Sequence, residues 1–309
     1  MKNGRSLRGS ALLLLTAFIW GVAFAAQSKA MEYCGPFTFN GARSFLAAAA
    51  LFLIWLLRGH PVTAGVPLKK QLGGAALCGV ALFCASTLQQ VAMQFASAGK
   101  AGFFTALYIV LVPLAGIFLH RRPSVTVWIA VALAACGLYL LCGGSGFSMG
   151  KAELCLLGCA VCFAVQILLL DRFAVQIDPV LLCCVQFTVV GLGSLPLLLT
   201  AETPSLAQLR SVIGPLLFVG LLSGAIGYTL QIVGQRDVDP TLASLLMSFE
   251  SVFSVLGGAV LLQQHLSGAE IGGCVLMFAA IILAQLPVGI DLSKKSKKTK
   301  EKRGKTVEF

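Results

Sequence analysis

Long apolar runs separated by short polar connections make up nearly the whole chain. Each run is about 20 residues long, which is the length that an α-helix needs to cross the hydrocarbon core of a bilayer. Ten such runs cover residues 9–29, 36–57, 72–94, 99–119, 125–142, 153–171, 179–199, 213–235, 240–262 and 269–288. The runs are continuous rather than alternating, which excludes a transmembrane β-barrel. The pattern therefore predicts an all-α integral membrane protein with ten transmembrane helices.

Composition and the placement of charge add an orientation. Of the 309 residues, 58% are hydrophobic and 11% are charged, whereas a soluble domain carries about 25% charged residues. Most of the 23 lysines and arginines fall in the N-terminal segment, in the connections on the same side, and in the C-terminal tail. Because these residues favour the cytoplasmic side, we predict an N-in/C-in topology in the bacterial inner membrane.

The net charge of +11 follows this topology and does not indicate a nucleic-acid partner. Residues 289–309 contain the run "KKSKKTKEKRGK". Such a run is typical of a disordered cytoplasmic tail that binds anionic lipid. Nearly all of the 11 cysteines fall within or beside the apolar runs, where they are expected to pack as small apolar residues. Cys155, Cys159 and Cys162 share a helix face, but a soft-metal site needs a further ligand, so we expect no metal and no cofactor.

The two halves of the chain repeat each other. At a shift of 143 residues, Pro36 falls on Pro179 and the aromatic Trp20 falls on Phe163. The tripeptide "TLQ" recurs at a shift of 142, which indicates one inserted residue between these anchors. The apolar runs follow the same offset, so the repeat concerns whole helices rather than scattered identities.

Each repeat holds five helices, residues 9–142 and 153–288. Because five is odd, the second repeat enters the membrane from the opposite side, an arrangement typical of secondary transporters. The first run also has the outline of a cleavable signal peptide, with a basic start, an apolar core and small residues after it. Its counterpart in the second repeat favours a retained helix instead.

The residues that carry this repeat also carry a resemblance. "IWGVAF" lies in the first run, "PFTFNGARSFLAAAALFL" in the second, "SAGKAGFFTALYIVLVPLAGIFL" in the fourth and "ASLLMSFESVFSVLGGAVLLQQHLS" in the ninth. In order and spacing the chain resembles the drug/metabolite transporter superfamily, of the type with two EamA domains. The resemblance implies ten helices around a central cavity and transport of small metabolites such as amino acids, nucleosides or drugs.

The sequence departs from that family at three places. The family often ends its fourth and ninth helices with Gly-Glu-Arg, where this chain has "HRR" (120–122) and "QQH" (263–265). The family's Glu-Pro in the ninth helix is Glu250-Ser251 here. A role assigned to the helix-end acids elsewhere therefore does not transfer to this chain.

Two ionisable residues lie inside the predicted membrane region, and such residues are functional candidates by default. Glu250 is near the middle of the ninth run, where it is a candidate for proton coupling or for binding a substrate ammonium group. The alternative is a hydrogen-bonded carboxyl that ties helices together. Arg43, in the second run, is a candidate counter-ion for a substrate carboxylate or phosphate. Its alternative is a side chain that extends to the interface. The two residues pair with each other or with charged groups of a substrate, and the shift of 143 aligns Glu250 with Leu107.

Uncharged polar residues form stripes on several predicted helices. A wet cavity would explain the stripes together, whereas hydrogen bonds between helices would explain each one singly. With the two charged residues, the predicted cavity set is Trp20, Asn40, Arg43, Gln90, Tyr108, Gln186, Tyr228, Gln231 and Glu250. Lys100 is expected either at the outer mouth or extended to the interface.

These patterns predict a secondary transporter that works by alternating access and exports a small metabolite such as an amino acid or a related amphipathic compound. It is expected to act as a monomer or a homodimer. The alternatives are a membrane-embedded enzyme and a non-transporting scaffold or receptor. An enzyme is disfavoured because His60, His120 and His265 share no helix face and the chain has no phosphate-binding glycine loop.

Overall fold

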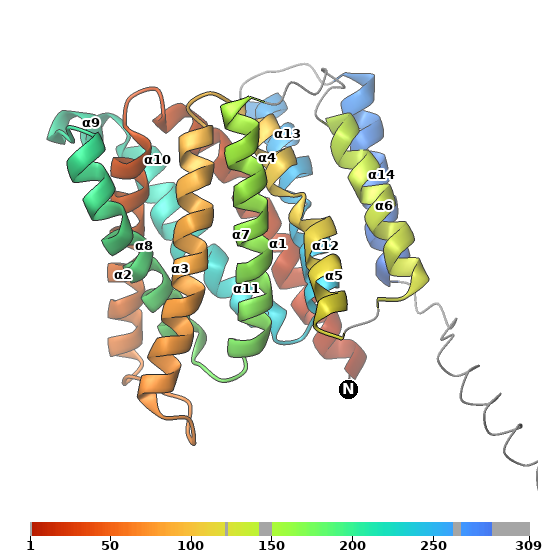
Figure 1. Ribbon diagram of the computed structural model, residues 1–309, viewed down its shortest axis with the longest axis horizontal. Helices are drawn as coiled ribbons and strands as arrows, with labels where there is room; N and C mark the ends of the chain where they lie inside the picture. The colour runs from red at the N-terminus through yellow and green to blue at the C-terminus, as the bar shows by residue number, and fades with distance from the viewer. Residues whose placement is uncertain (1, 121–122, 142–149, 262–266, 286–309) are drawn as a thin grey trace, which may run out of the picture.

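The computed structural model describes residues 2–120, 123–141, 150–261 and 267–285, and throughout these residues its regular structure is helical. The helices form a bundle in which most of them run between the same two ends (Figure 1). The predicted basic tail, residues 289–309, lies outside the described residues, as do Arg121, Arg122 and residues 263–265.

The helices follow each other in the order that the apolar runs predict. The first part of the chain forms α1 (Lys2–Ala30), α2 (Pro36–Leu57), α3 (Leu68–Ala92), α4 (Ala98–Thr105), α5 (Tyr108–Phe118) and α6 (Val125–Leu141). The remainder forms α7 (Lys151–Phe173), α8 (Pro179–Ala201), α9 (Leu206–Ser211), α10 (Ile213–Leu217), the π-helix η1 (Phe218–Gly227), α11 (Tyr228–Gln235), α12 (Pro240–Met247), α13 (Glu250–Leu261) and α14 (Gly268–Gln285).

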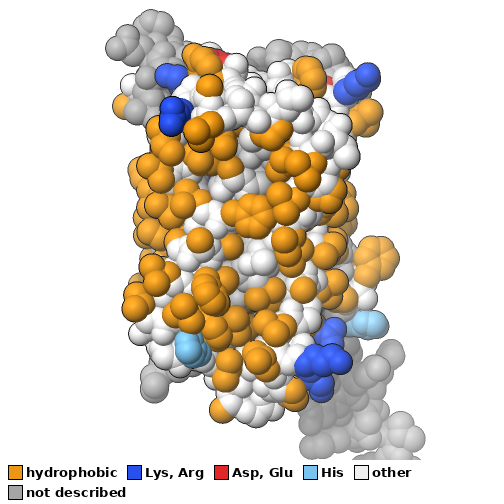
Figure 2. Space-filling model, turned by 90° about the vertical axis from the view of Figure 1, so that its left-hand side faces the viewer, with side chains coloured by type: hydrophobic (Ala, Val, Ile, Leu, Met, Phe, Trp, Pro, Cys, Tyr) orange, Lys and Arg blue, Asp and Glu red, His pale blue; other side chains and the backbone are white. Residues whose placement is uncertain are grey.

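In the described part of the chain, eight helical segments are long and apolar enough to cross a membrane, so this is a multi-pass membrane protein. Two further apolar helices, Val125–Leu141 and Gly268–Ala284, are shorter than that length. Ten spans and the N-in/C-in orientation therefore stay predictions. The surface agrees with burial in lipid: hydrophobic side chains cover the middle of the visible face, and Lys and Arg gather at its ends (Figure 2).

The fourth and ninth apolar runs are each broken, which the hydropathy pattern did not predict. α4 ends at Thr105 and α5 begins at Tyr108, whereas α12 ends at Met247 and α13 begins at Glu250. In the ninth run, Ser248 Oγ donates to the carbonyl of Leu245 at 2.8 Å, a local bond that competes with the helical ladder. In the fourth run, Pro113 lacks an N–H and weakens the helix just beyond the break.

The predicted run 213–235 contains the η1 segment, whose glycines allow close approach to neighbouring helices. A Cβ atom at Gly220 would lie 2.9 Å from Leu46 Cδ2, and one at Gly227 would lie 2.8 Å from Trp20 Nε1. The π-helical stretch therefore packs directly against α1 and α2. Such local widening of a helix is frequent at functional sites.

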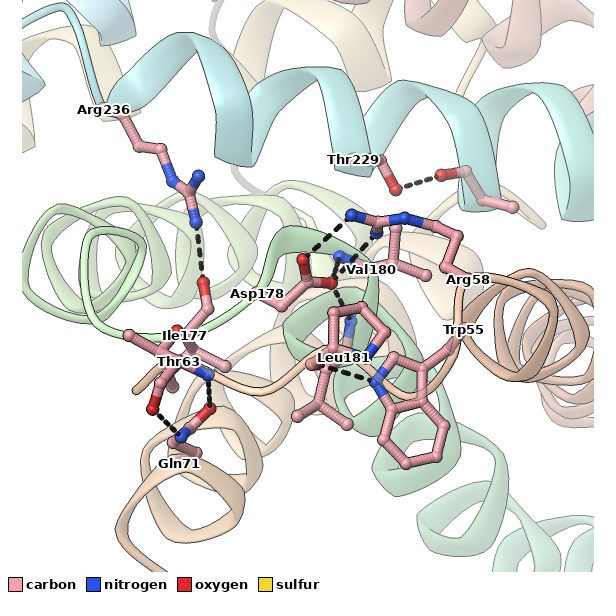
Figure 3. Close-up of polar contacts among 12 residues, drawn as sticks. Trp55, Arg58, Thr63, Gln71, Ile177, Asp178, Val180, Leu181, Thr229 and Arg236 are labelled. Atoms are coloured by element: carbon pink, nitrogen blue, oxygen red, sulfur yellow. Dashed lines mark hydrogen bonds and ion pairs between the residues drawn. The ribbon is translucent and has the colours of Figure 1, made fainter. Parts of the chain in front are cut away.

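α2 and α8 lie antiparallel and are joined at both ends. At one end, the Arg58 guanidinium contacts the Asp178 carboxylate at 3.2 and 3.3 Å (Figure 3). At the other end, Glu202 accepts hydrogen bonds from the backbone N–H groups of Phe37 and Thr38 at 2.9 and 2.8 Å. The C-terminal side chain of each helix thus binds the N-terminal turn of the other.

Candidate functional site

A cavity lies in the centre of the bundle, between α1, α2, α3, α7, α8, η1, α11 and the two broken helices. It holds about 640 Å³ of space that no protein atom fills, including solvent that reaches into it. Six of the nine residues predicted from the sequence line it: Trp20, Arg43, Tyr108, Tyr228, Gln231 and Glu250. The other three, Asn40, Gln90 and Gln186, are fully buried beside it and hydrogen-bond to residues behind or along its wall.

Arg43 faces the cavity from α2 and is held by two neutral amides. Its Nε and Nη2 atoms donate to Asn40 Oδ1 at 3.0 and 2.8 Å, and its Nη1 atom donates to Gln27 Oε1 at 2.6 Å. Asn40 is oriented in turn, since its Nδ2 group donates to the Ser86 hydroxyl at 3.3 Å. Arg43 therefore does not extend to the interface, and the network directs its guanidinium into the cavity.

Glu250 lies at the start of α13, where a negative charge interacts favourably with the helix dipole. Its side chain is 3% exposed, and its Oε1 atom accepts a hydrogen bond from the Tyr108 hydroxyl at 3.0 Å. Tyr108 lies at the start of α5, so the two residues occupy the same place at the two helix breaks, 142 positions apart. The alignment of Glu250 with Leu107 was therefore wrong by one residue.

Arg43 and Glu250 do not pair with each other. The ion pairs among the described residues are Arg58–Asp178 and Lys100–Glu153. Instead, Tyr228 lies within electrostatic range of both charged groups. The cavity thus presents a cation and an acid on separate parts of its wall, each hydrogen-bonded only to uncharged groups within the described chain.

Aromatic rings form the wall next to the charged groups. The rings of Trp20 and Tyr228 have centroids 4.6 Å apart, and Phe187 packs edge-on against Tyr228 at 5.1 Å. Trp20 Nε1 donates to the carbonyl of Ser223 at 3.3 Å, which fixes the indole on the η1 segment. An apolar or planar part of a ligand can pack here while its charged groups reach Arg43 or Glu250.

A chain of three glutamines lies beside the opposite part of the cavity. Gln231 Nε2 donates to Gln166 Oε1 at 3.4 Å, and Gln166 Nε2 donates to Gln186 Oε1 at 3.2 Å. This leaves Gln231 Oε1 without a partner among the described residues, and the same is true of Ser44 Oγ. Both side chains line the cavity, so these two buried atoms are available to a ligand or to water.

Sequence reasoning missed several residues of this site. Gln27, Ser44, Ser86, Gln89 and Thr105 all line the cavity, and Gln166 lies in the glutamine chain. Gln27 was placed near the end of an apolar run, and Gln166 is a single polar residue within another. An isolated amide in an otherwise apolar run is the signal that could have found both.

Lys100 differs from the expectation that it lines the outer mouth or extends to the interface. Its Nζ atom forms an ion pair with Glu153, at the first turn of α7, and this pair joins α4 to α7. Glu153 also accepts a hydrogen bond from the backbone N–H of Gly150 at 2.8 Å. Further along the same seam, Cys159 packs against Thr105, with 3.9 Å between Sγ and Oγ1.

Comparison with known proteins agrees with this architecture. A model of the EamA-like transporter family matches the chain twice, at residues 7–143 and 150–286. An uncharacterized transporter of Archaeoglobus fulgidus is 28% identical over 280 residues, covering 89% of this chain and 85% of that protein. An S-adenosylmethionine/S-adenosylhomocysteine transporter of Chlamydia trachomatis is 27% identical over 255 residues, covering 78% and 75%.

A solved crystal structure has the same fold, with a TM-score of 0.72 at 20% identity, covering 89% of this chain and 96% of that one. The family and the names of these relatives indicate transport across a membrane rather than catalysis. A small molecule is accordingly the substrate. With two matches that together span most of its length, the chain belongs to the EamA-like transporter family and is a membrane transporter.

Proposed function

We propose that the chain is a secondary transporter of a small zwitterionic metabolite, such as an amino acid or a compound that carries an amino-acid group. The observation that supports this most directly is the separation of Arg43 from Glu250 on one cavity wall, each bonded to uncharged partners. A ligand with a carboxylate and an ammonium group supplies the missing counter-charge to both. The aromatic wall formed by Trp20, Tyr228 and Phe187 favours a ligand with an apolar or planar part.

One similar protein supports the same class of substrate. The Chlamydia trachomatis relative is named as a transporter of S-adenosylmethionine and S-adenosylhomocysteine. Both of those compounds contain an amino-acid group joined to a planar base. Compounds of this kind are therefore the first to test, together with the amino acids themselves.

Transport proceeds by alternating access between two inverted five-helix halves, in the bacterial inner membrane and in the direction of export. The equivalent breaks at Tyr108 and Glu250 support the inverted-repeat part of this proposal. Glu250 is proposed to couple transport to protons, because a buried acid can bind either a proton or a substrate cation. Tyr108, Tyr228 and Cys159 are the titratable groups that face it, and Arg43 is the charged group in the same cavity.

The test is uptake of labelled amino acids and S-adenosylmethionine into proteoliposomes that contain the purified protein. We expect Arg43→Gln to raise the apparent KM for carboxylate-bearing substrates about tenfold or more, since leaving one partner of a buried charge pair alone is costly. Glu250→Gln should remove the dependence of transport on pH while the protein still inserts.

Three results would contradict the proposal. Unchanged kinetics in Arg43→Gln would remove the counter-ion role of Arg43. An unchanged pH profile in Glu250→Gln would remove the coupling role of Glu250. Chemical conversion of the solute, instead of its recovery unaltered inside the liposomes, would favour the enzyme alternative.

A further inference from the structure

Gln27 contacts Arg43 where an acidic residue would neutralise it. Gln27 lies on α1, is 5% exposed and lines the cavity. Its Oε1 atom accepts two hydrogen bonds, from Arg43 Nη1 at 2.6 Å and from Gln90 Nε2 at 2.9 Å. The oxygen is therefore fixed in position by donors from two other helices. Since the amide carries no charge, it orients the guanidinium without cancelling its positive charge.

The hydrogen bonds of Arg43 leave part of its guanidinium for a ligand. Arginine carries five N–H groups, and the contacts to Asn40 and Gln27 use three of its nitrogen atoms once each. One N–H on each terminal nitrogen has no printed partner in the described structure, and these are the groups that bind a carboxylate in a bidentate way. Both amides thus position Arg43 while its charge and two of its donors face the cavity.

We propose that Gln27 determines the charge preference of the cavity: its neutral amide keeps Arg43 uncompensated, and so selects substrates that bring a carboxylate of their own. The proposal rests on the proposed function, in which Arg43 binds the substrate carboxylate. A glutamate at this position would occupy the same volume and would keep both hydrogen bonds to Oε1. It would also supply a permanent internal anion, in competition with the carboxylate of the substrate.

The second half of the chain supports this reading of the first. The shift of 143 residues places Gln186 at the position of Arg43. Gln186 is likewise held by a glutamine, because its Oε1 atom accepts a hydrogen bond from Gln166 Nε2 at 3.2 Å. Both halves therefore place an amide against this residue of their second long helix, but only the first half has a cation there. Selection of an anionic group consequently depends on the Gln27–Arg43 contact.

The test compares two chemically matched sets of solutes, the common amino acids and the corresponding amino-acid amides, which lack the carboxylate. Each set is supplied as a mixture to proteoliposomes, and the accumulated compounds are measured by mass spectrometry. We expect the wild-type protein to accumulate amino acids in preference to amides. Gln27→Glu should lower the ratio of acid to amide uptake by about tenfold or more, the scale on which interfacial charge pairs act.

Two further variants make the test specific. Gln89→Glu introduces the same change at another cavity glutamine, whose Nε2 donates to Thr105 rather than contacting Arg43, and should leave the ratio near the wild-type value. Asn40→Asp places a charge at the second amide that holds Arg43 and should lower the ratio as Gln27→Glu does. It also tests the proposal independently if Gln27→Glu fails to insert.

The outcomes separate this inference from the function on which it rests. If Arg43→Gln abolishes the preference for amino acids while Gln27→Glu and Asn40→Asp keep it, Gln27 does not set the charge preference. If Arg43→Gln also keeps the preference, or if the wild-type protein has none, the carboxylate-binding role of Arg43 is wrong as well. Equal effects of Gln89→Glu and Gln27→Glu would show a general response to negative charge and would overturn the specific role of Gln27.

Discussion

Tyr108 and Glu250 occupy the same place at the two helix breaks, yet they carry different chemistry. Each is the first residue of the second half of a broken helix, and the two are joined by a hydrogen bond of 3.0 Å. The bond therefore links α5 directly to α13 across the cavity. A phenol opposite a carboxylate is an asymmetric pair, in which the tyrosine donates and the ionised acid accepts.

Tyr108→Phe removes this donor and keeps the ring, which packs against Phe163 with centroids 6.5 Å apart. We expect the variant to be less stable by about 1–3 kcal/mol, because hydrogen bonds to charged groups are stronger than neutral ones. The cost should be largest at a pH where Glu250 is ionised and should shrink as the acid is protonated. Thermal unfolding in detergent at several pH values measures this dependence.

Tyr108→Phe/Glu250→Gln and the two single variants complete a double-mutant cycle. The coupling between the two sites is the quantity that belongs to the hydrogen bond. Additive effects of the two single substitutions would show that the contact contributes little to stability. Phe163→Leu is the control, since it changes the packing around Tyr108 without touching the bond.

At the scale of elements, the two ends of the α2–α8 pair use a carboxylate in different ways. Asp178 precedes α8 and caps it directly, by accepting hydrogen bonds from the N–H groups of Val180 and Leu181 at 3.0 and 3.3 Å (Figure 3). α2 begins instead after Gly35, which has no side chain for this role. Glu202 fills that space from α8, since a Cβ at Gly35 would lie 2.3 Å from its carboxyl carbon.

Glu202→Gln should destabilise the protein by about 1–3 kcal/mol, the usual cost of leaving a buried donor without its partner. An amide has one acceptor oxygen, so it cannot replace both carboxylate oxygens, which accept from Phe37 N, Thr38 N and the Thr38 hydroxyl. Arg58→Gln at the other end is the matched control. The Arg58 side chain is 45% exposed, so this change should cost only about 0–1 kcal/mol. Equal losses in thermal unfolding would contradict this ranking.

The positions of most helices could be predicted from the sequence, because apolar length and helix-start residues act locally. Pro36 and Pro179 begin α2 and α8 as the repeat indicates. The breaks and their register could not be predicted in this way. The two breaks follow the shift of 142, whereas Pro36 and Pro179 follow the shift of 143. A single offset applied along the whole repeat therefore aligned Glu250 with Leu107 instead of Tyr108.

The candidate site was predictable only in part, for a related reason. Helices that lie in lipid are apolar on most faces, so the sequence does not show which face meets the cavity. Strongly polar residues such as Arg43 and Glu250 stand out, and both line the cavity. Gln27 gains its significance only from the α2 and α3 side chains that donate to it. Contacts between helices depend on rotation and crossing, which no local pattern records.

At the scale of the whole molecule, the two repeats differ in how their helices meet at the ends of the bundle. The α4–α7 seam, formed by Lys100, Glu153, Thr105 and Cys159, carries an ion pair at the end of the bundle where α7 begins (Figure 1). The shifts of 142 and 143 residues place Leu242 and Ser10 at the equivalent positions of the α1–α12 contact. That seam consequently has no ion pair at these positions.

This difference should bias the proposed alternating-access cycle. An ion pair in one seam stabilises the state in which that seam is closed, and its repeat counterpart offers no matching charge. Lys100 is 32% exposed and Glu153 is 7% exposed, so the pair is partly screened and should contribute about 1 kcal/mol. A difference of that size shifts a two-state equilibrium about fivefold. Lys100→Met should therefore raise the fraction of molecules in which the α4–α7 seam is open.

Cys159 provides a native probe for this opening, because it is fully buried in the same seam. In a variant that retains Cys159 as its single cysteine, a membrane-impermeant maleimide is applied to each face of the membrane in turn. Lys100→Met should speed labelling several-fold, and only from the face at which α7 begins. Arg58→Gln, which removes the ion pair at the opposite end of the bundle, should leave the labelling rate unchanged. Equal labelling of Cys159 with and without the Lys100 substitution would mean that the pair joins two helices that do not separate. In that case the gating movements would have to occur at other seams.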